Sequence, residues 1–532
     1  MEFERVDVAG YRDLMNRYGI GSLAAKMFCG AGFSDEQIRD ITGTPVMEDQ
    51  SEDLNLRKIR ERIMKAAENG EKVFIAGDYD TDGLCGTAIL VRLLNRLGIQ
   101  NGYYIPNRTN EGYGLNMERT VQAISKGYSL FILVDNGVKA KEPLAYCKAN
   151  GVNTIVLDHH TMDEEVGCDE LFHPDIAKGS RSWLCGAGCA YEVARMFGYE
   201  EDPEILMLAM TATIGDMMEL RGENRAIVKK GLAWMNSRPM QALKELIVRK
   251  DPPYNETDIA FQIVPKLNAV GRLAEGNETN RVVEYLSADD PVKIHALAGK
   301  LLEKNTERKE LTDRMIRSIR PEELTQDFVF VYHEDFKPGV VGLAAAHLSS
   351  DLGKPVVVAG KKGNQAVASA RCPEGLNVME LLAPVSDCFD AFGGHPGAAG
   401  FSFSLERLET VRDTIGKIVC QAPSAKEPVV VLNDDDLTDE NFEELFSYRP
   451  FGMGAKLPMA GIENPVVVSE RELGRPEYKK WTFSNGLSAL TFEASKITEE
   501  TGRDKAFYAG RLDEEWFRGK RSYMLRLSKI KK

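Results

Sequence analysis

The sequence predicts an α/β protein with three parts: a parallel-sheet domain, a second α/β domain joined to it by a long helix, and a small β-rich region at the C-terminal end. Between about residues 47 and 220, short apolar runs alternate with helical stretches, a pattern typical of a parallel sheet that is covered on both faces. A long polar helical pattern covers about residues 289–323, and short strand patterns follow residue 428. The 532 residues are enough for roughly three or four domains.

The first region contains three buried-strand patterns, at residues 72–76, 130–134 and 154–157. A charged helical stretch precedes the first strand, and a helix from about residue 86 to 98 follows it. Each strand ends in acidic or histidine residues. Ligands of parallel sheets bind outside the carboxyl ends of the strands, so we expect these polar clusters to converge on one edge of the sheet.

The second region has strand patterns at residues 328–332 and 355–358, with stretches rich in Gly and Ala at 339–346 and 393–400. A linker-like stretch, residues 422–428, precedes the last part of the chain. That part has short strand patterns separated by Gly and charged residues, at 429–432, 466–468, 482–483, 489–492, 506–509 and 523–527. It therefore predicts a small β-barrel or sandwich.

Composition limits the function classes. The chain has 67 Lys and Arg against 81 Asp and Glu, a formal net charge of −14, which excludes a uniformly basic nucleic-acid coat but leaves local basic patches open. The nine cysteines are irregularly spaced, which favours reduced thiols over a disulfide framework. We find neither a signal-peptide pattern nor an apolar run of membrane-spanning length, and we expect a soluble cytoplasmic protein without a membrane partner.

Three carboxylates, Asp78, Asp80 and Asp82, occupy alternate positions directly after the first strand. Such a concentration of like charge is costly unless a cation neutralises it. The run resembles the start of an EF-hand loop, but Ile89 stands where that loop needs a Glu, and a strand rather than a helix precedes the run. A solvated acidic turn is the simpler alternative.

Further candidate ligands follow later apolar runs. Asp135 follows the second strand, the triplet at residues 158–160 (Asp158, His159 and His160) follows the third, and Asp216 follows the apolar run 205–210. Helix capping is the alternative for each Asp. At one sheet edge, these clusters would form a two-metal site whose carboxylate content favours Mn²⁺ or Mg²⁺ over Zn²⁺. Two such metals suit phosphoryl hydrolysis.

A phosphoester substrate also needs basic or amide donors, for which Arg108, Arg272 and Arg371 are candidates, although a lone Arg is more often a surface charge. The run 393–400, Gly-Gly-His-Pro-Gly-Ala-Ala-Gly, would let a backbone approach a phosphate closely, with His395 as a further donor. A tight turn that leads into a helix or strand is the alternative for this run.

Many motifs in this order resemble the DHH phosphoesterase superfamily, and within it the RecJ family of single-strand-specific exonucleases. They are GDYDTDGLCGTAIL, YYIPNRTNEGYGLN, LVDNGV, LDHH, LCGAGCAYE, TATIGDMMEL, ENR, VPKLNAVGRL, GVVGLAAAHL, GGHPGAAGF, RPFGMG and FRGKRSYMLRL, spread over about residues 15–530. The resemblance implies an N-terminal helical segment (1–45), a catalytic DHH domain (46–235), a helical region with the connecting helix (236–323), a DHH-associated domain with the GGH motif (324–422) and an OB-fold nucleic-acid-binding domain (423–532).

The resemblance also assigns roles to residues. It implies that seven residues bind metal, that Asp158 orients its neighbours, and that four residues bind substrate phosphate. The implied metal ligands are Asp78, Asp80, Asp82, Asp135, His159, His160 and Asp216. All of them except Asp78 are also the implied catalytic residues. The implied phosphate-binding residues are Arg371, His395, Arg272 and Arg108. The chain departs from the family pattern at Lys337, Ala455 and His173, none of which is an implied metal ligand.

The C-terminal region combines aromatic and basic residues, a mixture that suits single strands because bases stack and phosphates pair. The aromatic residues are Trp481, Phe483, Phe492, Tyr508 and Trp516. Burial in a barrel core is the alternative for each of them. The basic run from residue 518 to the end stands out in an acidic chain, so we expect Arg518, Lys520 and Arg521 to contact DNA.

We therefore expect a metal-dependent exodeoxyribonuclease that degrades single-stranded DNA from 5′ to 3′, releases 5′-mononucleotides and serves DNA repair and recombination. Two divalent ions are implied, Mn²⁺ first and Mg²⁺ second. A single-strand-binding protein and a helicase are the implied protein partners of a monomeric enzyme. The alternatives are a DHH phosphodiesterase of short oligonucleotides or cyclic dinucleotides, and a non-catalytic DHH scaffold that binds nucleic acid.

Overall fold

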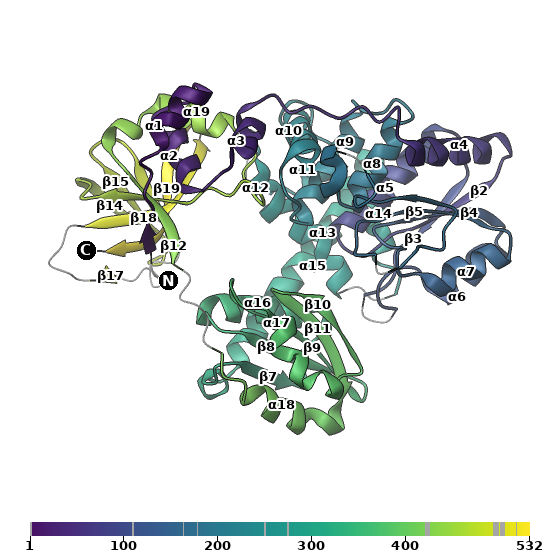
Figure 1. The fold of residues 1–532 in the computed structure, drawn as a ribbon. Helices are drawn as coiled ribbons and strands as arrows, with labels where there is room; N and C mark the ends of the chain where they lie inside the picture. The colour runs from purple at the N-terminus through teal and green to yellow at the C-terminus, as the bar shows by residue number, and fades with distance from the viewer. Residues whose placement is uncertain are drawn as a thin grey trace.

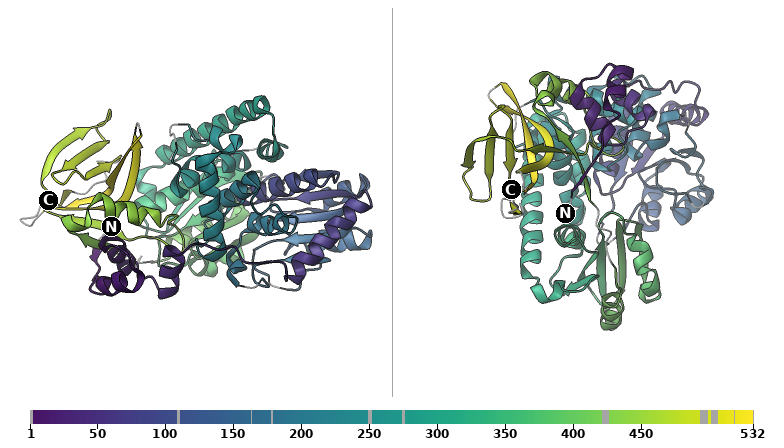
Figure 2. Two further views of the ribbon diagram at one scale, coloured as in Figure 1. Left: turned by 90° about the horizontal axis from the view of Figure 1, so that it is seen from above. Right: turned by 60° about the vertical axis from the view of Figure 1, so that its left-hand side comes forward.

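The computed structural model describes residues 3–108, 111–162, 164–177, 179–248, 252–273, 276–420, 426–492, 499–500, 506–517 and 519–531. The chain forms three lobes (Figure 1): a first lobe at the right, a second lobe below it, and a third lobe at the left that also holds both chain ends. The views in Figure 2 show the same separation of the third lobe from the sheet of the first. No helix in the described ranges is long and apolar enough to cross a membrane.

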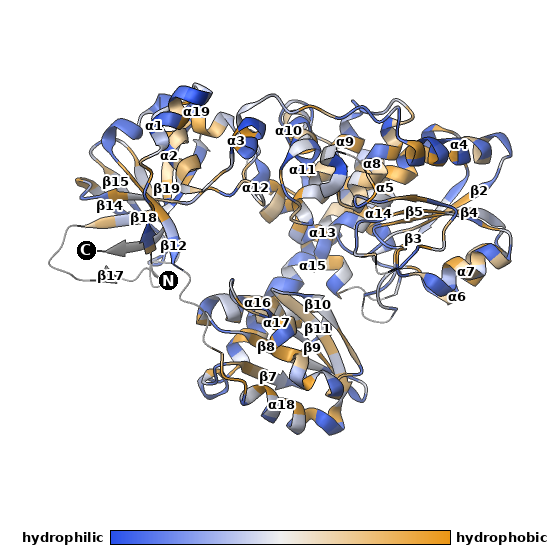
Figure 3. Cartoon of the chain, in the orientation of Figure 1, coloured by the Kyte–Doolittle hydropathy of each residue, from blue (hydrophilic) through white to orange (hydrophobic). Residues whose placement is uncertain are grey.

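The first lobe is built on a five-stranded parallel sheet with the order β3-β2-β4-β5-β6. Its strands are β2 (Lys72–Ala76), β3 (Asn101–Tyr104), β4 (Tyr128–Val134), β5 (Asn153–Leu157) and β6 (Glu170–Phe172). Alternate residues of the central strands enter two separate apolar clusters, one on each face of the sheet. The predicted two-sided parallel sheet is confirmed, and the hydrophobic colours in Figure 3 concentrate on these strands and the helices packed on them.

Helices cover both faces of this sheet. One face packs on α4 (Leu54–Glu68), α5 (Thr81–Arg96) and α8 (Gly186–Arg195), with α9 (Pro203–Gly215) and α10 (Gly222–Ser237) behind them. The other face packs on α6 (Met117–Ser125) and α7 (Lys141–Ala149). The loops that follow β2, β4 and β5 lie at the carboxyl edge of the sheet, where polar residues were predicted.

A helical segment connects the first two lobes. It contains α11 (Gln241–Glu245), α12 (Glu256–Asp258), a π-helical turn (Ile259–Ile263), α13 (Val264–Leu273), α14 (Asn280–Ser287) and α15 (Pro291–Ser318). The 28 residues of α15 extend for about 42 Å. Asp290 caps its start through a hydrogen bond to the backbone N–H of Val292, and Pro291 occupies the first helical position, where no N–H is needed. The predicted connecting helix is confirmed.

The second lobe holds a mixed five-stranded sheet with the order β10-β11-β9-β8-β7. Its elements are β7 (Val329–His333), α16 (Pro338–Leu352), β8 (Val356–Lys362), β9 (Gln365–Arg371), α17 (Val378–Leu382), β10 (Ala391–His395), β11 (Ala398–Ser404) and α18 (Leu408–Gly416). The run 393–400 forms the β10–β11 hairpin, in agreement with the tight-turn interpretation. A Cβ atom at Gly394 would lie 2.3 Å from the carbonyl oxygen of Ala398, so only Gly fits there.

The third lobe is a mixed sheet of nine strands with the order β1-β12-β13-β18-β19-β16-β15-β14, in which β17 also pairs with β19. Its elements are β1 (Phe3–Arg5), β12 (Glu427–Leu432), α19 (Asp439–Ser447), β13 (Met459–Glu463), β14 (Val467–Glu472), β15 (Lys479–Phe483), β16 (Ser488–Thr491), β17 (Glu499–Glu500), β18 (Phe507–Phe517) and β19 (Lys520–Lys531). The predicted β-rich C-terminal region is thus confirmed as a mixed sheet. The sequence patterns did not identify β1, β13 or β17.

The N-terminal helices pack on this third lobe. They are α1 (Tyr11–Tyr18), α2 (Ser22–Gly30) and α3 (Asp35–Thr42). Phe28 of α2 and Phe442 of α19 belong to one apolar cluster, and the buried pair Lys26–Asp436 joins α2 to the C-terminal region at 2.6 Å. The two ends of the chain therefore share one core, although the domain boundaries given above stay a prediction.

Candidate metal centre

The acidic loop after β2 is held by the start of two helices. Asp80 caps α5, because its Oδ1 accepts the backbone N–H groups of Asp82 (3.0 Å) and Gly83 (3.3 Å). The Asp82 carboxylate accepts the N–H groups of Gly186 (2.7 Å) and Ala187 (2.8 Å) at the start of α8. The positive ends of two helices thus stabilise carboxylates that burial would otherwise disfavour.

Asp135 follows β4 in a left-handed backbone conformation, with φ of 58°. The start of α8 approaches it so closely that a Cβ atom at Gly186 would lie 2.6 Å from the Cβ of Asp135. The hydroxyl of Tyr113 donates to the Asp135 carbonyl at 2.8 Å. Backbone strain of this kind persists only where surrounding contacts fix it, as they do here.

The triplet after β5 places two imidazoles beside these carboxylates. Nε2 of His159 lies 3.2 Å from Oδ1 of Asp135 and 3.6 Å from Oδ2 of Asp82. Asp158 points away from this centre: its Oδ2 accepts the N–H of Val138 at 3.0 Å, and its Oδ1 lies 2.8 Å from Nδ1 of His160. These contacts join Asp158 to the backbone of Val138 and to the ring of His160.

Asp216 reaches the same centre from a different kind of element. The apolar run before it belongs to α9, so Asp216 follows the end of a helix rather than a strand of the sheet. Its Oδ2 lies 3.6 Å from Nε2 of His159. Asp216 therefore comes from a helix end, and its side chain meets those that follow the strands.

The seven predicted ligands form three overlapping groups, and within each group one possible ligand atom per residue lies within 4.8 Å of the others. The groups are Asp78, Asp80 and Asp135; Asp82, His159 and Asp216; and Asp135, His159 and His160. The structure therefore brings together every residue for which metal binding was predicted.

The residues fit divalent cations. Oδ1 of Asp78 is buried and has no hydrogen-bond partner in the described structure. Burial and the charge of Asp80 raise the pKa of Asp78, and burial together with Asp82 and Asp80 raises the pKa of Asp216 to about 9. A carboxylate cluster this unfavourable without a counter-charge, with imidazole nitrogen beside it, is the ligand chemistry of Mn²⁺ or Mg²⁺.

The two imidazoles differ in their electrostatics. Burial lowers the pKa of His159, which favours the neutral ring that can bind a metal. Burial also acts to lower the pKa of His160, but the hydrogen bond to Asp158 and the charges of Asp158, Asp82 and Asp80 together raise the net pKa. Nδ1 of His160 faces Oδ1 of Asp158, and this contact fixes the orientation of the ring beside the acidic centre.

A cluster of arginines lies beside the acidic centre. The Arg108 guanidinium lies over the ring of Tyr79, 5.0 Å from its centroid. Burial and the charges of Arg108, Arg308 and Arg371 lower the pKa of Arg272 to about 9. Arg371, at the end of β9, donates to Ser369 Oγ at 2.7 Å. Three predicted phosphate-binding residues are thus neighbours, and the structure adds Arg308 of α15, which the sequence analysis missed.

The remaining predicted contacts are more dispersed. His395 is exposed at the tip of the β10–β11 hairpin, and no described contact connects it to the arginines. In the C-terminal region, Arg518 lies outside the described residues and Lys520 is exposed. Arg521 pairs with Glu514 at 2.7 Å, so part of its charge is already neutralised.

The five aromatic residues of the C-terminal region divide into two groups. Trp481, Phe483 and Tyr508 are buried in the core, as the alternative interpretation held. Phe492 and Trp516 keep 47% and 37% of their surface exposed. Only the exposed pair can offer ring faces to a base without rearrangement of the core.

Other residues that the sequence analysis did not single out also support the site. The side-chain oxygen of Asn268 in α13 accepts the N–H (2.8 Å) and hydroxyl (2.9 Å) of Thr81, between Asp80 and Asp82. The sequence signal that could have identified Asn268 is its position within the motif VPKLNAVGRL. His173, one of the positions that depart from the family pattern, is buried. Its Nε2 lies 2.9 Å from the carbonyl oxygen of His160.

The other two departures differ in their burial. Ala455 is fully buried in the core of the third lobe, whereas Lys337 is exposed at the start of α16. Neither belongs to a candidate metal-binding group.

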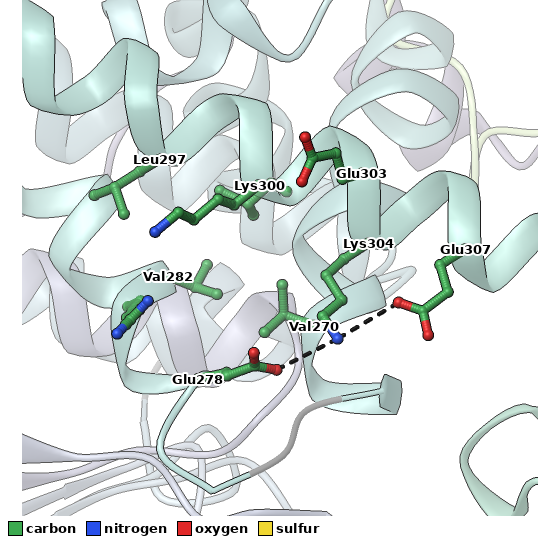
Figure 4. A pocket seen from close by; sticks show the side chains of 10 residues that line it. Val270, Glu278, Val282, Leu297, Lys300, Glu303, Lys304 and Glu307 are labelled. Carbon is green, nitrogen blue, oxygen red and sulfur yellow. Dashed lines mark ion pairs between the residues drawn. The ribbon is translucent and has the colours of Figure 1, made fainter.

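A separate cavity of about 530 Å³ lies between α13, α14 and α15 (Figure 4). Val270, Val282, Leu297 and Leu301 line it together with charged residues. Lys304 lies 3.5 Å from Glu278 and 3.4 Å from Glu307 at this cavity. None of the candidate ligands lines it, so it is not the metal centre.

A parallel sheet with these Asp and His clusters at its edge, joined by a long helix to a second α/β lobe, defines the DHH class of phosphoesterases. The family described as "DHH family, N-terminal domain" matches residues 72–214, and the "DHHA1 domain" matches residues 325–420. Individual relatives identify a narrower family within this class. The chain is 30% identical to a single-stranded-DNA-specific exonuclease RecJ of Bacillus subtilis over 92% of its own length, and 30% identical to that of Thermus thermophilus over 85%.

A crystal structure of RecJ from Thermus thermophilus in complex with Mn²⁺ shares the fold, with a TM-score of 0.83 at 25% identity, covering 100% of this chain and 79% of that one. The chain belongs to the RecJ family. It spans 65% of the length of the Bacillus subtilis protein and 67% of the Thermus thermophilus protein.

Proposed function

We propose that the chain is a single-strand-specific 5′→3′ exodeoxyribonuclease that hydrolyses phosphodiester bonds with two divalent ions, releases 5′-mononucleotides and acts in DNA repair and recombination in the cytoplasm. The observation that carries the proposal is the convergence of seven carboxylate and imidazole side chains next to a cluster of arginines. The names of the relatives support the choice of single-stranded DNA as substrate.

In this proposal, Asp78, Asp80 and Asp135 hold one metal ion, and Asp82, His159 and Asp216 hold the other, with His160 beside Asp135. Mn²⁺ is the first choice and Mg²⁺ the second. When bound, the ions polarise the phosphate and lower the pKa of the attacking water. The protein's own contribution is to fix these ligands through helix starts and through the contacts of Asp158, and to keep His159 neutral.

The arginines supply the second half of the site. Arg108 and Arg272 come from the first lobe and the connecting segment, and Arg371 comes from the second lobe. Arg108 lowers the pKa of both Arg272 and Arg371, and Arg371 lowers that of Arg272, so the cluster is short of negative charge, and a substrate phosphate would relieve this repulsion. His395 is a further proposed phosphate contact from the hairpin of the second lobe.

The third lobe would hold the strand that leads away from the site. A cavity of about 890 Å³ between the second and third lobes connects Arg371 with Lys456 and Arg511 of the third lobe, and acidic residues also line it. The exposed rings of Phe492 and Trp516 and the β19 residues Lys520 and Arg521 are the proposed base and phosphate contacts. A single-strand-binding protein and a helicase are the proposed partners of a monomeric enzyme.

The test uses Asp80→Ala and wild-type protein with Mn²⁺ and DNA labelled at the 5′ or the 3′ end. We expect immediate release of labelled mononucleotide from 5′-labelled single strands, little attack on duplex, and loss of cleavage but retention of DNA binding in Asp80→Ala. Asp413→Ala, an exposed carboxylate of α18, is the matched control and should cleave normally.

Three results would contradict the proposal. Near wild-type cleavage by Asp80→Ala would show that the assignment of the metal site is wrong. Activity confined to dinucleotides or cyclic dinucleotides would instead identify a small-substrate phosphodiesterase. Binding of single strands without any turnover would identify a non-catalytic scaffold.

A further inference from the structure

The third lobe contacts the loop that follows Asp216. Asp216 ends α9, and residues 217–221 lead from it to α10. The backbone N–H of Leu220 donates to the carbonyl of Met453 at 2.8 Å, and Asp40 of the N-terminal segment accepts the N–H of Gly222. We call this contact between residues 216–222 and residues 448–454 the joint.

A fully buried arginine of the first lobe forms hydrogen bonds to the third lobe beside the joint. Arg225 of α10 has no exposed surface and donates to the backbone carbonyls of Tyr448, Pro450 (2.8 Å) and Ile41 (3.3 Å). These acceptors belong to the third lobe and to the N-terminal segment packed on it. A buried guanidinium without such acceptors would be strongly destabilising, so Arg225 requires the third lobe to be docked.

The joint also reaches the acidic loop by a second route. Arg449 pairs with the buried Glu256 at 2.9 Å, and the N–H of Phe451 donates to the same carboxylate at 3.2 Å. Glu256 begins the helical run formed by α12, the π-helical turn and α13. Asn268 on this run holds Thr81, between two candidate ligands. One end of the run thus contacts the third lobe, and the other end contacts the metal centre.

Two glycines make the close approach possible. A Cβ atom at Gly452 would lie 2.8 Å from Cδ1 of Leu220. Gly454 adopts a left-handed conformation with φ of 71°, and a Cβ atom there would lie 3.2 Å from the side chains of Glu219 and Arg221. The third-lobe chain therefore lies directly against the loop that follows Asp216, and a side chain at Gly452 would displace Leu220.

We propose that the joint is a positioning device for the metal centre: docking of residues 448–454 sets the loop that carries Asp216 and the helical run that carries Asn268, so that the third lobe helps to hold the metal ions as well as DNA. This inference rests on the proposed function, because it assumes that Asp216 binds a metal. Arg225, Arg449 and Gly452 act through other residues and touch no candidate ligand themselves.

The competing explanation is that the joint only anchors a DNA-binding lobe. The two explanations differ at the Asp82–His159–Asp216 group, because an anchor alone leaves metal binding unchanged. They differ again for a dinucleotide, because a lobe that only anchors DNA would affect longer strands alone.

The experiment uses the full chain with Gly452→Val, which places a side chain against Leu220, and Arg449→Met, which removes the ion pairs with Glu256, Asp513 and Glu514. Arg62→Met is the control, since it removes a half-buried ion pair with Glu71 (2.7 Å) at the opposite end of the sheet. Mn²⁺ binding is measured by calorimetry and by the electron paramagnetic resonance spectrum of the bound ion, and thermal unfolding identifies any variant that does not fold.

We expect one of the two Mn²⁺ ions to bind about tenfold more weakly in both joint variants, with an altered spectrum and a parallel loss of dinucleotide cleavage, while Arg62→Met matches the wild type. Normal Mn²⁺ binding and dinucleotide cleavage in folded joint variants, with a loss only on long strands, would overturn the inference. Failure of the wild-type chain to bind Mn²⁺ would instead overturn the proposed function, so the two failures are distinguishable.

Discussion

Nδ1 of His160 lies 2.8 Å from Oδ1 of Asp158, a carboxylate with no exposed surface. Although burial acts to raise the pKa of Asp158, the hydrogen bond and charge of His160 lower it, so this carboxylate stays ionised. The same Oδ1 accepts the backbone N–H groups of His159 (2.8 Å) and His160 (3.2 Å). One buried charge therefore sets both the backbone and the ring orientation of the two imidazoles.

Asp158→Ala should weaken Mn²⁺ binding by about 10- to 100-fold, because it leaves His160 without the partner that fixes its tautomer. Asp158→Asn should lose less, since an amide oxygen can still accept from Nδ1 of His160. Calorimetric titration with Mn²⁺ measures both variants. Equal losses in the Ala and Asn variants would show that charge rather than orientation is the contribution of Asp158.

The raised pKa of Asp216 gives the metal-free protein a pH dependence of stability. Its pKa is about 9 in the folded chain against an ordinary value of 3.8, so between these values the folded state binds more protons than the unfolded state. Its contribution to the free energy of unfolding must therefore fall as the pH rises through that window. Asp216→Asn removes this contribution.

We expect the melting temperature of metal-free wild-type protein, measured in chelator, to fall more steeply than that of Asp216→Asn between about pH 5.5 and pH 8.5. Saturating Mn²⁺ should raise the wild-type value most at the upper end, where the carboxylates are ionised and bind the ion best. Parallel pH profiles for the two metal-free proteins would contradict the assigned shift.

The sequence predicted those parts of the site that follow chain order. Asp80 and Asp135 come directly after buried parallel strands, and such strands end at one edge, so their convergence follows from the pattern. Asp216 shows the limit of this reasoning. Helix α9 is buried on nearly all sides and has no amphipathic period, so its apolar run does not reveal that the residue after it ends a helix.

Features that depend on distant pairing could not be predicted. Phe3 of β1 pairs with Glu427 of β12, and nothing in either local sequence identifies the other. Arg308 is one of many charges on α15, and only the packing of the lobes around that helix places it beside Arg272. The joint has the same origin, since Arg225 lies in a charged run whose partners are backbone carbonyls and leave no mark in the sequence.

The exposed rings of Phe492 and Trp516 should contribute to the binding of single strands. We expect an Ala substitution at either position to weaken binding of a long oligonucleotide by about 1–3 kcal/mol, with little effect on the melting temperature. Trp481→Ala is the contrasting control, because removal of this buried ring should lower the free energy of unfolding by about 3–5 kcal/mol. Fluorescence anisotropy measures DNA binding, and thermal unfolding measures stability. Unchanged affinity for the oligonucleotide in both the Phe492 and Trp516 variants would show that these rings do not contact DNA.

Arg308 should bind substrate at a cost to stability. Its Nε is buried without a hydrogen-bond partner among the residues that the structure describes, burial lowers its pKa, and its charge repels that of Arg272. Arg308→Met should therefore raise the melting temperature of the DNA-free protein, because it removes an uncompensated charge. The same change should weaken single-strand binding by about tenfold, since a charge-assisted phosphate contact is lost, and leave Mn²⁺ affinity unchanged.

The matched control for this prediction is Arg314→Met, an exposed arginine on the same helix, which should alter neither property. Thermal unfolding without DNA and anisotropy with a 5′-phosphorylated oligonucleotide measure the pair of effects. A lower melting temperature in Arg308→Met would show that this arginine has a structural partner in the folded chain. Unchanged DNA affinity would exclude it from the phosphate site, because repulsion within the arginine cluster can be relieved only by an anion that binds there.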